Sequence, residues 1–174
     1  MDQPVTLRVM SAANRDDVLA LRLAPGQDRY VSSVSESLQE AKEYPQANPW
    51  CRAVYAGDEP VGFVMVSWNC APKPPDIIGP WFLWKLLIDE RRQRRGYGRE
   101  AVRLVVDLVR AEGADDLLTS YVPEGEDGPG PFYERLGFTP TGEVDPGGEI
   151  IMRLNLRTGT PPRRRALRGS DRAE

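Results

Sequence analysis

The segment from Trp81 to Glu112 constrains the fold of this chain more than any other. It begins with an apolar run, WFLWKLLID, of the kind found in strands that are buried on both faces. The next residues, RRQRRGYGR at 91–99, hold five arginines and two glycines. From Tyr97 onward, apolar residues recur with the spacing of an amphipathic helix that ends before Gly113. The segment therefore predicts a strand, a glycine-rich turn and a helix.

This turn is suited to hold an anion, because backbone N–H groups and the positive end of a helix dipole converge at a helix N-terminus. Gly96 and Gly98 would let a phosphate approach the backbone where a Cβ would block it, and the arginines would supply charge-assisted hydrogen bonds. The turn is not a P-loop, because no Gly-Lys-Ser/Thr follows it. It fits the dinucleotide-binding pattern only loosely, and it lies in mid-chain rather than in an opening βαβ unit.

The other segments predict strands and helices around this unit. Ser33, with Glu36 three residues later, forms a capping box for a helix that stops before Pro45. Strands are predicted at 5–9, 50–55, 60–68, 81–89, 116–122, 138–144 and 149–156, and helices at 11–24, 32–44, 97–112 and 130–137. This order predicts an α/β (α+β) fold with a central, mixed and mostly antiparallel sheet of about seven strands, flanked by about four helices.

The composition limits the chemistry that is available. The chain has no histidine, and Cys51 and Cys70 are its only cysteines. Ser-His and Cys-His nucleophilic pairs are thereby excluded, and no metal site is expected, so acid–base chemistry falls to carboxylates, tyrosines, lysines or water. The net charge of -3 argues against a nucleic-acid partner.

One domain, residues 1–156, followed by a basic tail, residues 157–174, is the predicted organisation. The tail combines proline, glycine and arginine without apolar periodicity, which is typical of a disordered extension. The longest apolar run is far too short to cross a bilayer, and the N-terminus has no secretion signal. We therefore expect no membrane partner and a cytoplasmic location.

Two motifs carry a resemblance to a known family. The residues from Gln93 to Gly98, QRRGYG, resemble the Q/R-x-x-G-x-G/A acetyl-CoA signature of the GNAT superfamily of N-acetyltransferases. The residues from Tyr133 to Phe138, YERLGF, resemble the Y-x-x-x-G-F segment of the same superfamily, and the predicted element order is similar to its own. Within it, the stretch from Trp81 to Phe138 looks like the bacterial diamine and spermidine/spermine acetyltransferases.

The resemblance implies roles for particular residues. Tyr133 would be the general acid that protonates the departing CoA thiolate; a phenol with a pKa of about 10 and a thiol with a pKa of about 8.5 suit such a transfer. Glu126 takes a position where the family often has an asparagine that contacts CoA. The other cofactor-binding residues implied are Leu86, Leu87 and Ile88, through their backbone beside the pantetheine arm, and Gln93, Arg94, Arg95, Gly96, Tyr97, Gly98 and Arg99 around the phosphates.

An acceptor pocket and a general base are harder to assign. Trp81, Trp84 and Tyr30, with Trp68, are candidates for an aromatic cage around an aliphatic cation, and Glu36, Glu40 and Glu43 would add negative charge. The alternatives are tryptophans packed in the core and a solvated helix face. The glutamate that the family often carries on its fourth strand has no counterpart here. A water-mediated proton path, assisted by Glu126, Asp89 or a backbone carbonyl, is the interpretation that stays open.

The function implied is acetyl transfer from acetyl-CoA to a primary amine of a small molecule, with a polyamine favoured. An amino-bearing antibiotic is the first alternative, and a catalytically idle CoA-binding module is the second. The expected partners are a small-molecule amine acceptor and neither nucleic acid nor membrane, and the resemblance leaves a homodimer open.

Overall fold

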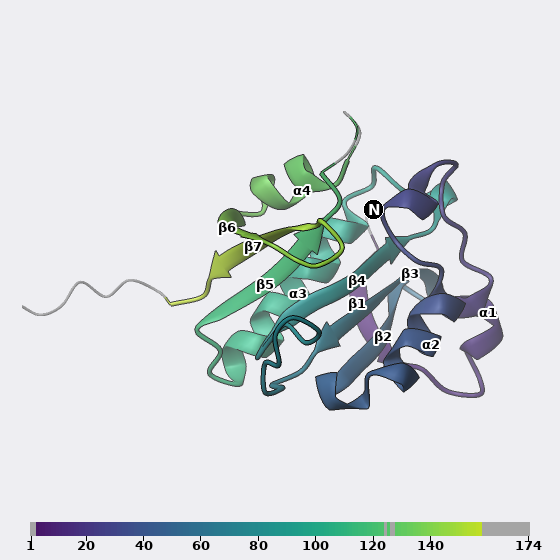
Figure 1. Cartoon of the computed structure of the whole chain (residues 1–174). Coiled ribbons are helices and arrows are strands. Elements are labelled where there is room, and N and C mark those ends of the chain that lie inside the picture. Colours follow the sequence, from purple (N-terminus) through teal and green to yellow (C-terminus); the bar gives the residue numbers. More distant parts are fainter. Residues whose placement is uncertain (1–2, 124, 126–127, 158–174) are drawn as a thin grey trace, which may run out of the picture.

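The computed structural model describes residues 3–123, 125 and 128–157, and within these it forms a seven-stranded sheet in the order β1-β2-β3-β4-β5-β7-β6 (Figure 1). The pair β4–β5 is parallel and the other pairs are antiparallel. The strands are β1 (Val5–Val9), β2 (Pro49–Ala56), β3 (Glu59–Ser67), β4 (Phe82–Ile88), β5 (Asp116–Tyr121), β6 (Thr139–Val144) and β7 (Ile150–Asn155). The α-helices are α1 (Arg15–Leu19), α2 (Val34–Glu43), α3 (Tyr97–Ala111) and α4 (Gly130–Arg135), and the 3-10 turns are η1 (Gln27–Arg29), η2 (Pro45–Ala47) and η3 (Glu90–Arg92). The predicted mixed-sheet fold is confirmed.

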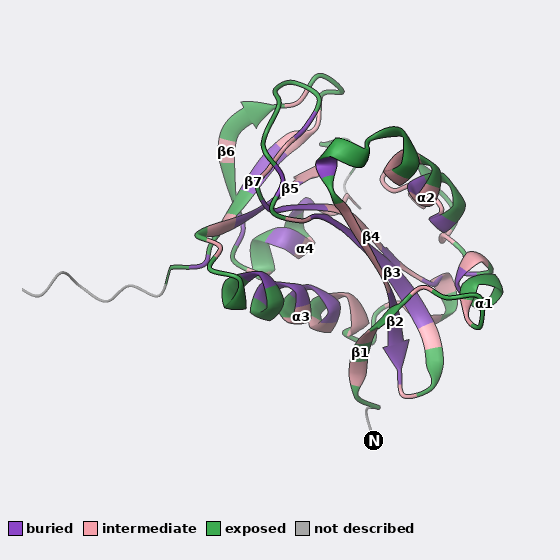
Figure 2. Cartoon of the chain, turned by 90° about the horizontal axis from the view of Figure 1, so that it is seen from below, coloured by how far each residue is buried: buried purple, intermediate pink, exposed green. Residues whose placement is uncertain are grey.

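Helices cover both faces of the sheet (Figure 2). Helix α3 buries five residues of one stripe against the sheet, and α4 adds Tyr133 to the same core cluster. Helices α1 and α2 cover the other face, where Val18 and Val34 pack with Phe63 and Met65 of β3. The apolar spacing that predicted α3 is therefore the spacing of residues that face the sheet.

The sheet opens between β4 and β5. Only two residue pairs join these strands, Phe82 with Leu118 and Leu83 with Thr119. The Thr119 hydroxyl donates to the Leu83 carbonyl oxygen at 3.0 Å, within the last residue pair of the two strands. On its other side β4 carries an irregularity, because Trp84 has no partner residue on β3. Beyond Leu83, the edge of β4 therefore faces β5 without pairing with it.

The N-terminal helix is shorter than predicted, whereas the second helix is capped as predicted. The Ser33 hydroxyl accepts from the Glu36 N–H at 3.2 Å, and a Glu36 carboxylate oxygen accepts from the Ser33 N–H at 2.8 Å. Helix α1 ends at Leu19 instead of running to residue 24. The Arg22 N–H donates to the Asp89 carboxylate at 3.0 Å, so a long-range hydrogen bond takes the backbone group that a longer helix would need.

The predicted tail lies outside the described residues except for Arg157, whose guanidinium is paired with Asp115 at 2.7 Å. In the part of the chain that the structure describes, no helix has the length and apolar character needed to cross a membrane.

Candidate active site

A cleft of about 1490 Å³ occupies the opening between β4 and β5. One wall is formed by β4, α2 and η1, and the other by the end of β5, α4 and the turn between β6 and β7. The glycine-rich turn lies at one end. The cleft thus lies where the sheet itself leaves backbone groups of β4 without a neighbouring strand.

The turn places free backbone N–H groups at the cleft. Gly96 is the N-cap of α3, with a φ of 82°, and no side chain caps the helix. The first hydrogen bond of the helix is from the Glu100 N–H to the Gly96 carbonyl at 3.0 Å, so the N–H groups of the first turn are available to a ligand. A Cβ added to Gly96 would meet no atom within 4 Å. This open space fits the approach of a phosphate to the backbone.

The surroundings of Gly98 do not require glycine in the way that was predicted, because a Cβ there would face protein and not a phosphate. A Cβ added there would face Phe132 of α4 at 3.4 Å and Ile88 of β4 at 3.6 Å, in ordinary van der Waals contact. The position therefore favours a small residue where α3 packs closely against α4 and β4, and a methyl group there would point at protein instead of at a phosphate.

The arginines of the turn divide into two groups. Arg94, Arg95 and Arg99 line the cleft and can reach phosphate oxygens. Arg92 also lines it but is paired with Glu59. Arg91 instead makes a two-pronged ion pair with the buried Asp89, at 2.9 and 3.2 Å. The positive charge that faces the cleft therefore comes from the second half of the motif.

Asp89 is a structural residue and not the proton acceptor that the sequence left open. Its carboxylate accepts backbone N–H groups from Arg22 and Arg91, both at 3.0 Å, in addition to the Arg91 guanidinium. Burial alone would raise the pKa of Asp89, but these hydrogen bonds outweigh it and hold the pKa below its ordinary value. The Asp89 carboxylate therefore stabilises the turn after β4 through these hydrogen bonds, and its lowered pKa makes it a poor base.

The β4 wall carries the residues predicted to lie beside the pantetheine arm. Leu86, Leu87 and Ile88 all line the cleft. The Gln93 side chain also lines it, and its Nε2 donates to the Ile88 carbonyl at 3.0 Å and to Gln27 Oε1 at 2.7 Å. Gln93 therefore joins the glycine-rich turn to β4 and η1.

Tyr133 lies in the cleft wall with its side chain almost fully buried. Its ring packs edge-on against Phe132 and Phe138, with centroids 5.1 and 5.6 Å away. Burial raises the pKa of Tyr133 to about 12; a hydrogen bond with Thr119 works against this shift, and the charge of Glu149 adds to it. The phenol is therefore protonated at neutral pH and can donate a hydrogen bond to a charge that develops beside it.

The structure brings two of the predicted acceptor aromatics to the cleft and leaves the others in the core. Trp84 and Tyr30 line the cleft, together with Tyr44, whose ring meets Trp84 edge-on at 6.1 Å. Trp81 is only 5% exposed and packs edge-on against Trp68 at 5.0 Å, and neither is among the described residues that line the cleft. The prediction of an acceptor role for Trp81 and Trp68 therefore does not fit the structure, since both serve the core.

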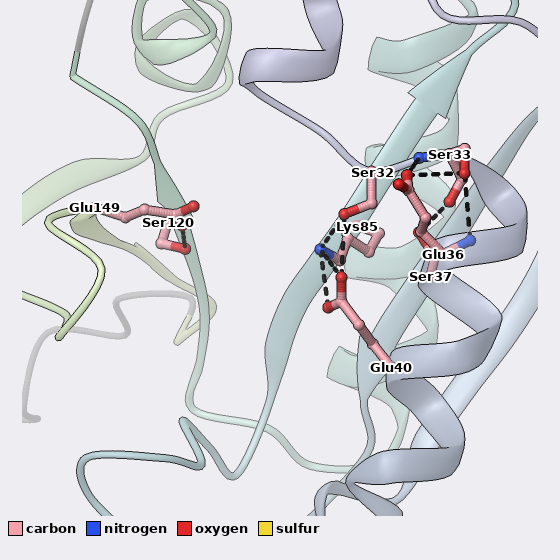
Figure 3. A network of polar contacts seen from close by, with 8 residues as sticks. All are labelled: Ser32, Ser33, Glu36, Ser37, Glu40, Lys85, Ser120 and Glu149. Atoms are coloured by element: carbon pink, nitrogen blue, oxygen red, sulfur yellow. Dashed lines mark hydrogen bonds and ion pairs between the residues drawn. The ribbon is translucent and has the colours of Figure 1, made fainter.

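Of the three helix glutamates, only Glu40 lines the cleft. It forms an ion pair with Lys85 of β4 at 3.0 Å, and the Lys85 ammonium also donates to the Ser32 hydroxyl at 3.0 Å (Figure 3). Glu36 is used in the capping box, and Glu43 accepts from Gln39 at 3.1 Å on the exposed side of α2. Lys85 stands on the strand where the sequence showed no carboxylate.

Residues that the sequence reasoning missed complete the second wall. Ser120 of β5 donates to Glu149, and both line the cleft opposite Lys85 and Glu40 (Figure 3). Asp145 and, on the β3–β4 loop, Asp76 line it as well. No local signal marked Glu149, which the periodicity placed in the closing strand. Glu126 lies outside the described residues, so its predicted contact with CoA is not addressed.

Comparison with known proteins agrees with this geometry. Residues 16–138 match the acetyltransferase (GNAT) family. A spermine/spermidine N(1)-acetyltransferase of Bacillus subtilis (strain 168) is 26% identical over 148 residues, which are 85% of this chain and 96% of that protein. A probable spermine N(1)-acetyltransferase of Bacillus subtilis subsp. natto (strain BEST195) is 25% identical over the same shares.

Solved structures share the fold. The PaiA N-acetyltransferase of Thermoplasma acidophilum, in complex with coenzyme A, has a TM-score of 0.60 at 13% identity and covers 88% of this chain and 99% of its own. An aminoglycoside 6'-N-acetyltransferase complexed with coenzyme A has a TM-score of 0.66 at 17% identity and covers 91% and 100%. The family match spans the whole strand, turn and helix unit and both motifs, so the chain belongs to the acetyltransferase (GNAT) family and is an N-acetyltransferase that uses acetyl-CoA.

Proposed function

We propose that the acceptor is a primary amine of a small polycationic molecule, and first of all a polyamine. The observation that carries this proposal is the charge of the acceptor end of the cleft. Four carboxylates line the cleft, those of Glu40, Asp76, Asp145 and Glu149, and we assign them to the acceptor end, away from the arginine-rich turn. The ammonium of Lys85 in this part of the cleft is already paired with Glu40. Such a surface favours a ligand that carries several positive charges.

The two ends of the cleft suit two different substrates. The arginine-rich turn would hold the phosphates of CoA, and the unpaired edge of β4 would bind the pantetheine arm as a short added strand. The aromatic rings of Trp84, Tyr30 and Tyr44 would contact the aliphatic segments of the amine. The two Bacillus subtilis relatives are named for spermine and spermidine, which supports the same class of acceptor.

The reaction we propose is direct transfer between the two bound substrates, without an acetylated enzyme. A β4 backbone N–H would stabilise the oxyanion, and Tyr133 would donate to the thiolate as it leaves. Because burial raises the pKa of Tyr133 to about 12, the phenol keeps its proton until that charge develops.

We also propose a cytoplasmic location, which fractionation of cells tests. The oligomeric state, monomer or homodimer, is tested by sedimentation of the purified protein.

An amino-bearing antibiotic is the second candidate, because an aminoglycoside is also a polycationic primary amine and would meet the same carboxylates. A panel assay separates the two. Thiol release from acetyl-CoA is measured with putrescine, spermidine, spermine, aminoglycosides and peptide N-termini, each over a range of concentrations. We expect the highest kcat/KM with a polyamine. A higher kcat/KM with an aminoglycoside would refute the polyamine proposal, and release with none of these amines would refute both.

A further inference from the structure

Glu149 on the cleft wall is held through both its backbone and its carboxylate. Its backbone N–H donates to Asp145 Oδ1 at 2.9 Å, and its carbonyl accepts from the Asp145 N–H at 3.0 Å, which closes the turn between β6 and β7. The Ser120 hydroxyl of β5 donates to Glu149 Oε2 (Figure 3). The described residues supply no hydrogen-bond donor to Oε1. One oxygen therefore fixes the side chain and leaves the other for a ligand in the cleft.

Glu149 and Tyr133 approach the cleft from opposite faces of the sheet. Thr119 contacts Tyr133 and is fully buried, and its alternate neighbours on β5, Leu117 and Tyr121, pack in the same cluster as α3 and α4. Side chains alternate along a strand, so Ser120 and the carboxylate that it holds belong to the other face. The negative charge of Glu149 nevertheless acts on Tyr133 and contributes to its raised pKa. No strand lies between the two groups, because β4 and β5 have separated at this level.

This arrangement matches what acyl transfer requires. The attacking nitrogen and the leaving sulfur lie on different sides of the carbonyl carbon, so a donor for the sulfur and an acceptor for the amine proton belong on different sides as well. The other carboxylates are engaged or lie apart: Asp145 Oδ1 accepts from the Glu149 N–H, and Asp76 is exposed on the β3–β4 loop. Glu40 is paired with Lys85, and Asp89 is buried in its contacts with Arg91.

We infer that Glu149 is the general base of the reaction and that Ser120 is a positioning residue for it. The inference rests on the proposed function, since it needs an amine as acceptor. The proton of the acceptor ammonium passes to Glu149 Oε1 and from there to water. The nitrogen lone pair then forms the N–C bond, the C–S bond breaks with its electron pair on sulfur, and the Tyr133 hydroxyl donates a hydrogen bond to that sulfur. The nitrogen, now positively charged, loses its second proton to Glu149 Oε1, and the CoA thiolate takes up one proton from water, so that one proton is released overall.

Titratable groups from several elements line the cleft together with Glu149, among them Asp76 of the β3–β4 loop and Arg135 of α4. Tyr133 comes from α4, Asp145 from the turn, and Lys85 and Glu40 lie across the cleft on β4 and α2. The ammonium of Lys85 is satisfied by Glu40 and Ser32, so it does not neutralise Glu149. A carboxylate kept free of a cation can receive a proton or an ammonium group.

The test compares acceptors that do and do not need a base. Putrescine is protonated at neutral pH, whereas hydroxylamine is not, so only putrescine depends on a proton acceptor for its attack. Glu149→Gln is compared with Glu143→Gln, an exposed glutamate of β6 in the same hairpin. We expect Glu149→Gln to lower kcat/KM for putrescine by about 10²- to 10³-fold and for hydroxylamine by less than about threefold, at unchanged affinity for CoA. Glu143→Gln should leave both values unchanged.

The outcomes separate this inference from the proposed function. If the wild-type protein acetylates putrescine and Glu149→Gln does so equally well, or loses as much with hydroxylamine, only the role of Glu149 is refuted. If the wild-type protein acetylates no amine, the proposed function fails and this inference fails with it. Should Glu149→Gln lose CoA binding, Ser120→Ala takes its place; a loss for putrescine of about 3- to 10-fold supports the inference, and a loss shared with hydroxylamine overturns it.

Discussion

Replacing Tyr133 with phenylalanine removes one oxygen atom from a nearly fully buried site in the cleft wall. The pKa of this phenol, raised by burial to about 12, is roughly 3.5 units above that of an ordinary thiol near 8.5. Complete proton transfer to such a thiolate would be uphill by about 5 kcal/mol. Tyr133 therefore contributes mainly as a hydrogen-bond donor to the developing charge, and a hydrogen bond to a charged group is worth about 1.5–3 kcal/mol. The predicted fall in kcat is about 10- to 150-fold.

The assay is thiol release from acetyl-CoA at saturating amine, together with a direct measurement of CoA affinity. We expect kcat to fall and the affinity to stay within about twofold of the wild type. Tyr55→Phe is the matched control, because Tyr55 is buried on β2 and is not among the described residues that line the cleft. A kcat within about twofold of the wild type, with CoA still bound, would refute the assignment of Tyr133 as the donor. A fall in kcat shared by Tyr55→Phe would show that lost packing is the cause.

Four further substitutions test the site. Gly96→Ala should cost about 1 kcal/mol of stability and weaken CoA binding, because the φ of Gly96 is 82°. Gly98→Ala should keep CoA binding and stabilise the protein by about 0.5–1 kcal/mol. Urea unfolding measures the stability of both variants, and titration measures their affinity for CoA. Asp89→Asn should lower the free energy of unfolding, measured with urea at pH 7, by about 3 kcal/mol. Because the pKa of Asp89 is lowered in the folded state, this difference should be constant above about pH 4 and shrink as the pH falls further. Lys85→Met leaves Glu40 unpaired in the cleft and should lower KM for spermidine about fivefold; an unchanged or higher KM would count against an electrostatic acceptor site.

The sequence was most informative where one local pattern decides the structure. The capping box at Ser33 and Glu36 and the apolar stripe of α3 each use contacts within a few residues, so their elements appear where they were predicted. The glycine-rich turn is also decided locally, because it depends on the positive φ of Gly96 and on the helix that begins directly after it. Helix α1 ended early because its chain is held by Asp89, a residue far away in the sequence.

The acceptor end could not be predicted, because it depends on how distant strands meet. Alternation places Trp81 and Trp84 on opposite faces, but an apolar run does not reveal which face is the core and which is the cleft. Trp81 therefore lies in the core and Trp84 lines the cleft. Glu149 reaches the cleft because β7, and not β6, pairs with β5. That strand order is a long-range choice, and nothing in the sequence near Glu149 indicates it.

The separation of β4 from β5 explains why one cleft can serve two substrates of opposite charge. A continuous sheet would pair the edge of β4 with its neighbour and keep the two layers of helices apart. Where the pairing stops after Leu83, backbone groups become available and both faces of the sheet reach the same space. The layer of α3 and α4 supplies helix N–H groups, arginines and Tyr133, and the opposite layer supplies Glu40, with Glu149 across from it. On the proposed function, an anionic thioester and a cationic amine would be drawn to opposite ends of one opening, and their reacting atoms would meet where the last strand pair ends.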